Sequence, residues 1–185
     1  MTVLIIIGVV VVVAILLGSM YNSLVKLRNN RENAFADIDV QLKQRHDLVP
    51  QLVETVKGYA AHEKDTFERV IAARNGAMSA RTIDDKIAAE NTLSSALAGM
   101  KITLEAYPEL KANQNFLQLQ EEISDLENKL SAVRRYFNSA TKEYNNAVET
   151  FPSNIIAGMF GFHKEIMFDL GKERSTYEEA PKIQF

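Results

Sequence analysis

The first 25 residues, MTVLIIIGVVVVVAILLGSMYNSLV, contain no charged side chain, and Lys26 is the first Asp, Glu, Lys or Arg of the chain. A helix of about 20 apolar residues is long enough to cross the hydrocarbon core of a bilayer, which is about 30 Å thick. No other feature restricts the fold as strongly, because such a helix has no polar face to place in water.

Three interpretations of this run compete. A soluble core helix would need burial on every side, which a 185-residue chain rarely provides. A cleaved signal peptide would need a basic start, and Gly18-Ser19-Met20 is a weak cleavage site. We therefore predict a retained single-pass anchor over residues 1–21. Its membrane-facing side chains are Val3, Leu4, Ile5, Ile6, Ile7, Val9, Val10, Val11, Val12, Val13, Ile15, Leu16 and Leu17.

The flanking charges predict the orientation of this anchor. Lys26, Arg28 and Arg31 precede the first acid, Glu32, whereas the short N-terminal side carries only its amine. Basic residues favour the cytoplasmic side of a membrane. We expect the N-terminus outside and the C-terminal domain in the cytoplasm.

Residues 22–151 are expected to form a bundle of long helices. Pro50 lies inside the first helical pattern, where it removes a backbone donor and predicts a kink. Arg28, Arg31 and Arg45 lie on or beside the apolar seam of this helix. If the anchor and this helix continue to about Glu63, they span about 90 Å. The apolar positions of the helix are Leu24, Phe35, Ile38, Leu42, Val49, Leu52, Val56 and Tyr59.

Turn and capping signals predict the next helix boundaries. A second helix is expected over residues 64–78, with Asn75-Gly76 as a candidate cap or break, and a third beginning near Thr82. Pro108 should end the third helix. Asn113 or Asn115 is expected to cap the fourth.

The fourth helix has the strongest pattern of the chain. From Phe116 to Phe151 apolar residues recur every three or four positions without one charge among them. An antiparallel bundle core explains this pattern better than an intermolecular coiled coil. The fold class expected is all-α, an N-terminal transmembrane helix continuing into an elongated antiparallel helical bundle with long helices. Its core includes Phe116, Leu119, Ile123, Leu126, Leu130, Val133, Phe137 and Tyr144.

Residues 152–170 form a separate apolar segment, and residues 171–185 a polar tail. Pro152 and Ser153 suit a helix start, with Ser153 as its cap, and the helix is expected to continue through Ile166 and Met167. The segment is too short to span a bilayer. Its wide apolar face can be covered by the end of the bundle, by another subunit through Gly158 and Gly161, or by the membrane interface. This candidate assembly or membrane face consists of Ile155, Ile156, Met159, Phe160, Phe162, Ile166 and Met167.

The sequence contains no recognisable catalytic, cofactor or metal motif. It has no cysteine, and its three histidines lie far apart. His46, with Asp47 and Glu54 near the predicted kink, is the best polar candidate, although a hydrogen bond at the surface or between helices explains His46 better than catalysis. A net charge of −3 without a basic block argues against nucleic-acid binding. We expect a protein that is not an enzyme and has no cofactor.

Three long stretches resemble the LemA family of bacterial membrane proteins. They are VQLKQRHDLVPQLVETVKGYAAHE at 40–63, AYPELKANQNFLQLQEEISDLENKLSAVRRYFNSATKEYN at 106–145, and TFPSNIIAGMFGF at 150–162. The resemblance implies a helical bundle tethered to the bacterial inner membrane. It also implies a hypothetical link to HtpX-type membrane proteases, but no catalytic residue.

The function expected is therefore a non-enzymatic, membrane-anchored helical scaffold or adaptor. It would assemble into a homo-oligomer, with a hypothetical role in membrane-protein quality control. The alternatives are a membrane-shaping or lipid-interface protein and a regulatory partner of a membrane protease.

Overall fold

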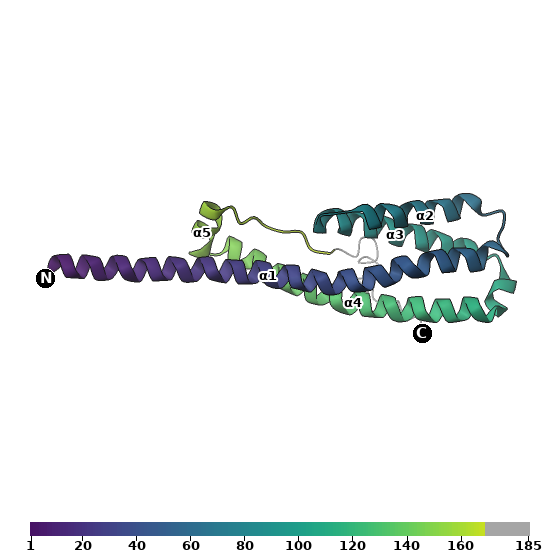
Figure 1. The fold of residues 1–185 in the computed structure, drawn as a ribbon, viewed down its shortest axis with the longest axis horizontal. Helices are drawn as coiled ribbons and strands as arrows, with labels where there is room; N and C mark the ends of the chain where they lie inside the picture. The colour runs from purple at the N-terminus through teal and green to yellow at the C-terminus, as the bar shows by residue number, and fades with distance from the viewer. Residues whose placement is uncertain (169–185) are drawn as a thin grey trace, which may run out of the picture. The chain divides into compact units, whose positions relative to one another are not determined.

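Helix α1 runs without interruption from Thr2 to Lys57 in the computed structural model, which describes residues 1–168 (Figure 1). The side chains of residues 3–17 are exposed around the whole helix. Within the described chain, α1 is the one helix long and apolar enough to cross a membrane. Its most apolar stretch of 18 residues has a mean hydropathy of 3.2, and none of that stretch is buried. The predicted apolar N-terminal helix is thus present and leads directly into the rest of the fold.

The remaining chain is helical with short connections, and no strand occurs in residues 1–168, so the all-α class is confirmed. The chain divides into two units that share α1 and α4: residues 1–38 with 132–167, and residues 39–131 with Phe168. The predicted polar tail, 171–185, and the end of the predicted segment 152–170 lie outside the described residues. The other helices are α2 (Lys64–Ser79), α3 (Ile83–Leu104), the 3₁₀ helix η1 (Pro108–Ala112), α4 (Gln114–Glu149) and α5 (Ser153–Phe160).

Local capping explains two of these boundaries. The Thr82 hydroxyl accepts a hydrogen bond from the Asp85 backbone N–H at 3.1 Å and caps α3. The Asn113 side chain accepts one from the Phe116 N–H at 3.0 Å and caps α4. Both caps satisfy backbone donors that the first turn of a helix leaves unpaired, as the sequence predicted.

The predicted second helix is present, because α2 runs from Lys64 to Ser79 and Asn75-Gly76 does not interrupt it. A single glycine costs only about 1 kcal/mol inside a helix. The predicted end of the first helix is wrong. Helix α1 ends at Lys57 and does not reach Glu63, so Tyr59 lies beyond it with an exposed side chain.

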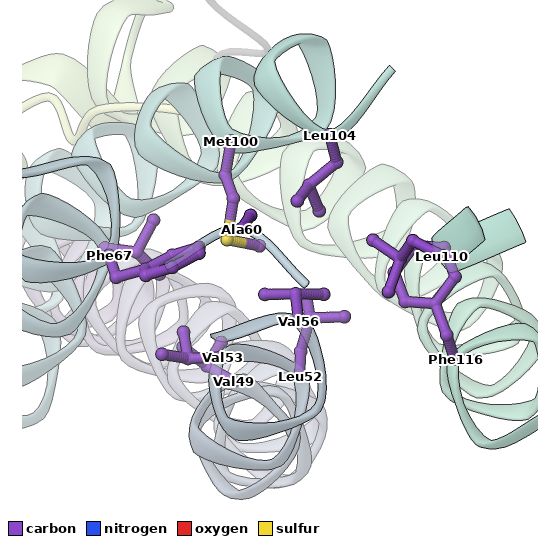
Figure 2. Packing of buried hydrophobic residues seen from close by; sticks show 11 residues of the cluster. Val49, Leu52, Val53, Val56, Ala60, Phe67, Met100, Leu104, Leu110 and Phe116 are labelled. Carbon is purple, nitrogen blue, oxygen red and sulfur yellow. The ribbon is translucent and has the colours of Figure 1, made fainter. Parts of the chain in front are cut away.

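The unit of residues 39–131 is an up-down-up-down bundle. Lys86 and Glu90 of α3 pair with Asp39 and Arg45 of α1, so these helices run in the same direction. Figure 2 shows Leu52 and Val56 of α1 pointing toward side chains of α3, η1 and α4 in one apolar core. The buried members of this core are Val49, Leu52, Val53, Val56, Ala60, Phe67, Val70, Met100, Leu104, Leu110 and Phe116.

In the unit of residues 1–38 and 132–167, α1 and α4 run antiparallel. The Tyr136 hydroxyl donates to Asn30 Oδ1 at 3.3 Å, and the rings of Phe35 and Phe137 meet edge to face at 5.4 Å. Farther along α4, Tyr144 packs against Leu24. These contacts place the middle of α1, from Leu24 to Phe35, beside the C-terminal part of α4.

The predicted core stripe of α4 faces inward for most of its length. Phe116, Leu126, Leu130, Phe137 and Tyr144 are buried, and Leu119, Ile123 and Val133 are half-buried. The stripe does not extend to Phe151, because α4 ends at Glu149 and the Phe151 ring is exposed.

We expect Leu126→Ala to lower the free energy of unfolding by about 2–5 kcal/mol, because it leaves a cavity in the core. Leu126 is 4% exposed, whereas Leu117 on the same helix is 48% exposed. Leu117→Ala is therefore the matched control and should cost much less. Urea unfolding of both variants measures the difference, and similar losses would show that Leu126 is not a core residue.

Candidate functional site

Pro50 lies inside α1 and has no N–H to donate to the carbonyl of His46, four residues earlier. Arg74 of α2 supplies the missing donor, because its Nε atom donates to the His46 carbonyl oxygen at 2.6 Å. The helix remains continuous through the proline, and the predicted kink at Pro50 stays a prediction. The freed carbonyl thus becomes an attachment point for α2.

His46 and Arg45 both turn toward Glu90 of α3. His46 Nε2 lies 2.5 Å from Glu90 Oε1, and Arg45 Nη1 lies 3.1 Å from Glu90 Oε2. Arg45 also donates to Ser94 Oγ at 3.0 Å and pairs with Glu127 at 2.8 Å. The Glu90 side chain is 1% exposed, so both of its oxygens are committed to bundle contacts.

This buried network is suited to holding helices in register. A buried charge is tolerated when it is paired and hydrogen-bonded, and removal of one partner is costly. Neither of two open surface depressions is lined by His46, Arg45 or Glu90. One is lined by Asp65, Glu68, Arg69 and Ala72, and the other by Tyr59, Glu109, Ala112, Asn113, Gln114 and Asn115.

The sequence-based grouping of His46 with Asp47 and Glu54 does not form a site. Asp47 and Glu54 are exposed, and Glu54 pairs with Lys57 at 3.3 Å. The partner of His46 is Glu90, which lies on the buried face of α3 between Ile87 and Leu93. An acid at this position in an apolar stripe is the signal that could have identified it. Among residues 1–168, no group of three or more His, Asp or Glu side chains is arranged to hold a metal ion.

The second candidate region lies in the other unit, where α5 packs against α1 just after the apolar run. The Tyr21 ring lies 4.9 Å from the Phe160 ring and 5.7 Å from the Phe162 ring, measured between centroids. Ile156 and Ala157 are buried against Leu24. One face of α5 is thus held at the end of the apolar run.

The predicted helix through Ile166 and Met167 is wrong, because α5 ends at Phe160. Gly161 follows with φ 71°, a left-handed conformation that glycine adopts without a Cβ penalty, and its N–H bonds back to the Ala157 carbonyl. The cap predicted at Ser153 is also wrong: Ser153 is the first residue of α5, and its hydroxyl donates to the Ala147 and Thr150 carbonyls.

Side chains of α1 and α4 hold the chain that follows α5. The Asn145 amide donates to the Glu165 carbonyl and accepts from the Glu165 N–H, both at 2.8 Å. Arg31 pairs with the Glu165 carboxylate at 3.1 Å and lies over the Phe137 ring at 5.1 Å. Because Arg31 and Asn145 are buried, these contacts fix the position of α5 from its C-terminal side.

Tyr144 lies beside this junction and has a perturbed acidity. Burial raises the pKa of the Tyr144 hydroxyl above its usual range, and the nearby Glu165 carboxylate raises this pKa further. Both effects disfavour the tyrosinate, because it would be a buried anion next to another anion.

The predicted apolar face divides into two groups. Ile156 and Phe162 are buried in the core with Leu24 and Tyr144. The other members are exposed: Ile155, Met159 and Phe160 on α5, and Ile166 and Met167 in the segment after it.

Comparison with known proteins decides the family. The model of the LemA family matches residues 34–185, which is most of the chain. The chain belongs to the LemA family. With its apolar N-terminal helix it is a membrane-associated member.

The curated relatives are distant in sequence, and their matches cover most of the chain. The protein LemA of Metamycoplasma hominis is 25% identical over 80% of this chain and 68% of its own length. The magnetosome protein MamQ of Magnetospirillum gryphiswaldense is 21% identical over 88% of this chain and 70% of its own length. A magnetosome protein MamQ 2 of Paramagnetospirillum magneticum is also 21% identical, over 80% of this chain and 64% of its own length.

We expect Pro50 and Arg74 to be energetically coupled in this LemA-family protein. Arg74→Ala should cost about 1–3 kcal/mol in the natural chain, because it leaves the His46 carbonyl without a donor. In a Pro50→Ala background the new amide can bond to that carbonyl, so the same change should cost less. A double-mutant cycle by urea unfolding measures the coupling. Equal costs in both backgrounds would show that Arg74 does not replace the missing amide.

We expect Tyr144 to titrate above about pH 10, the usual tyrosine pKa. The folded state favours the neutral phenol, so the stability from this group is intact below the unfolded pKa and is lost as the pH rises through the folded pKa. The difference in ultraviolet tyrosinate absorbance between the natural chain and Tyr144→Phe isolates this titration. The amplitude of the difference must correspond to the ionisation of one tyrosine. A midpoint at or below about pH 10 would contradict the effect of burial on this pKa.

Proposed function

We propose that this protein is a non-enzymatic scaffold that anchors a helical bundle to a membrane and assembles there with copies of itself. The observation that carries the proposal is the continuity of α1. Its first part is an apolar helix exposed on all sides, and from Leu24 onward the same helix supplies core residues. The membrane span is therefore joined directly to a packed core, as a scaffold fixed to a membrane requires.

The polar groups support a structural role. His46, Arg45 and Glu90 are committed to one another inside the bundle, and Arg31 with Asn145 holds the segment after α5. Catalysis requires groups that reach a bound substrate, usually in a concave pocket. A protein with this distribution of polar groups acts most readily through its surfaces.

The anchor supports the proposal of self-assembly within the membrane plane. The apolar run has no packing partner within the described chain, so its whole circumference is open to lipid and to other membrane helices. Helices in a bilayer associate by close packing, and confinement to one membrane raises their effective concentration.

The test is the mass of the full-length protein in mild detergent, measured by light scattering with correction for bound detergent. We expect a defined oligomer whose mass does not change with the ratio of protein to detergent. Two differently tagged copies should also copurify when they are expressed together. Copies expressed separately and mixed after solubilisation serve as the control for chance sharing of micelles.

A monomer at every detergent ratio, with no copurification of tagged copies, would overturn the assembly part of the proposal. A His46→Gln variant that fails to complement the phenotype of a deletion strain, although its stability and oligomeric mass are unchanged, would overturn the non-enzymatic part. That result would require a chemical role for the imidazole.

A further inference from the structure

We propose that α5 rests in the phospholipid interface beside the membrane span. The surface involved, here called the interfacial face, consists of Phe151, Ile155, Met159 and Phe160. This face contacts the boundary between the lipid headgroups and the acyl chains. This inference rests on the membrane anchoring in the proposed function and adds a second point of contact with the same bilayer.

The interfacial face is exposed although it is strongly apolar. The exposed fractions are 80% for Phe151, 54% for Ile155, 72% for Met159 and 58% for Phe160. Residues 150–162 contain no charged side chain. Single exposed apolar residues are normal in proteins, but four within ten residues and no intervening charge form a surface that needs a cover.

The packing of α5 sets its level relative to the bilayer. Crossing a hydrocarbon core of about 30 Å takes about 20 helical residues, and Thr2 to Tyr21 supplies that length. Tyr21 therefore marks the boundary of the core, where Tyr is favoured. Phe160 lies against Tyr21 at 4.9 Å between ring centroids. The ring of Phe160 is thus held at the edge of the acyl chains.

The charged groups nearby suit this placement. Lys26 and Arg28 follow Tyr21 by about 8–10 Å along α1, just beyond the polar interface of about 5–7 Å on each side of the core. Both side chains are exposed, and the Arg28 guanidinium lies 5.3 Å from the centre of the Phe162 ring. Long basic side chains can reach back toward phosphates while their stems lie on apolar surface.

The size of the interfacial face favours lipid over a second protein. A standard protein interface buries about 800 Å² on each partner, which four partly exposed side chains cannot supply. Insertion into an interface needs no complementary partner surface, and its strength follows the apolar area that is buried. The buried contacts of Ile156 and Phe162 also hold α5 in place before it meets lipid, which reduces the ordering cost.

The chain contains no tryptophan, so one introduced indole reports on a single position. We would reconstitute full-length Met159→Trp into phosphatidylcholine vesicles with and without lipids brominated on their acyl chains, and compare the tryptophan emission. Ile155→Trp gives a second, independent reporter. Both residues are exposed, so the larger ring should fit without disturbing the core.

Two matched variants calibrate the measurement. Val10→Trp places the indole in the membrane span and should be quenched strongly. Tyr136→Trp places it on α4 opposite Asn30, which lies about 13 Å beyond Tyr21 along α1, and should be quenched little. We expect quenching of Met159→Trp and Ile155→Trp to lie between these limits, clearly above that of Tyr136→Trp.

Quenching of both reporters no stronger than that of Tyr136→Trp would overturn the inference. A blue-shifted emission without bromine quenching would also overturn it, because protein would then cover the face. Weak quenching of Val10→Trp would instead show that the anchor is not in the bilayer, and would overturn the anchoring on which this inference rests. The oligomer measurement tests assembly separately, so failure of one proposal can be distinguished from failure of the other.

Discussion

Peptide groups inside a bilayer have no water to bond with, so every N–H and C=O of the apolar run must be satisfied within its own helix. Helix α1 meets this requirement from Thr2 onward, and its first proline is Pro50. The helix required by the membrane continues into the protein interior, where Leu24 and Phe35 are core residues of the first unit and Val49 is one of the second. The other helices pack against α1, whose helical conformation is required by the apolar run at its N-terminus.

Two arginines on the apolar seam of α1 specify what packs against them. Arg31 is paired with Glu165 in the first unit, and Arg45 with Glu90 in the second. An unpaired buried charge costs several kcal/mol, so alternative packings that separate these pairs are disfavoured. Apolar contacts supply most of the stabilisation, while the paired charges select one arrangement among several that would bury similar area.

The sequence was sufficient to predict the helices but insufficient for their polar contacts. The anchor, the caps at Thr82 and Asn113, and the buried stripe through Leu126 and Phe137 follow from local spacing and capping chemistry. The partners of Arg45 and Arg31 do not, because they are 45 and more than 130 residues away. The local pattern marks Glu90 as an acid in an apolar stripe, but it does not say which residue pairs with it.

The end of α5 shows a different limit of sequence reasoning. Extending the helical period past Gly161 placed Ile166 on the face of Ile155, but the glycine ends the helix and Asn145 directs the chain elsewhere. The sequence therefore predicted which apolar residues belong to this region, but not how they are arranged in space. Whether a given apolar residue was buried depended on α1, as Ile156 and Ile155 show.

The contact between Arg74 and the carbonyl freed by Pro50 has a mechanical consequence. A slip of α2 along α1 by one turn, about 5.4 Å, would bring the guanidinium to carbonyls that already accept bonds from their own helix. The His46 carbonyl, which Pro50 leaves without a helical donor, is thus a specific binding point for Arg74 on α1. Because the hydrogen bond forms only at this carbonyl, it fixes the position of α2 along α1 and opposes sliding of one helix past the other.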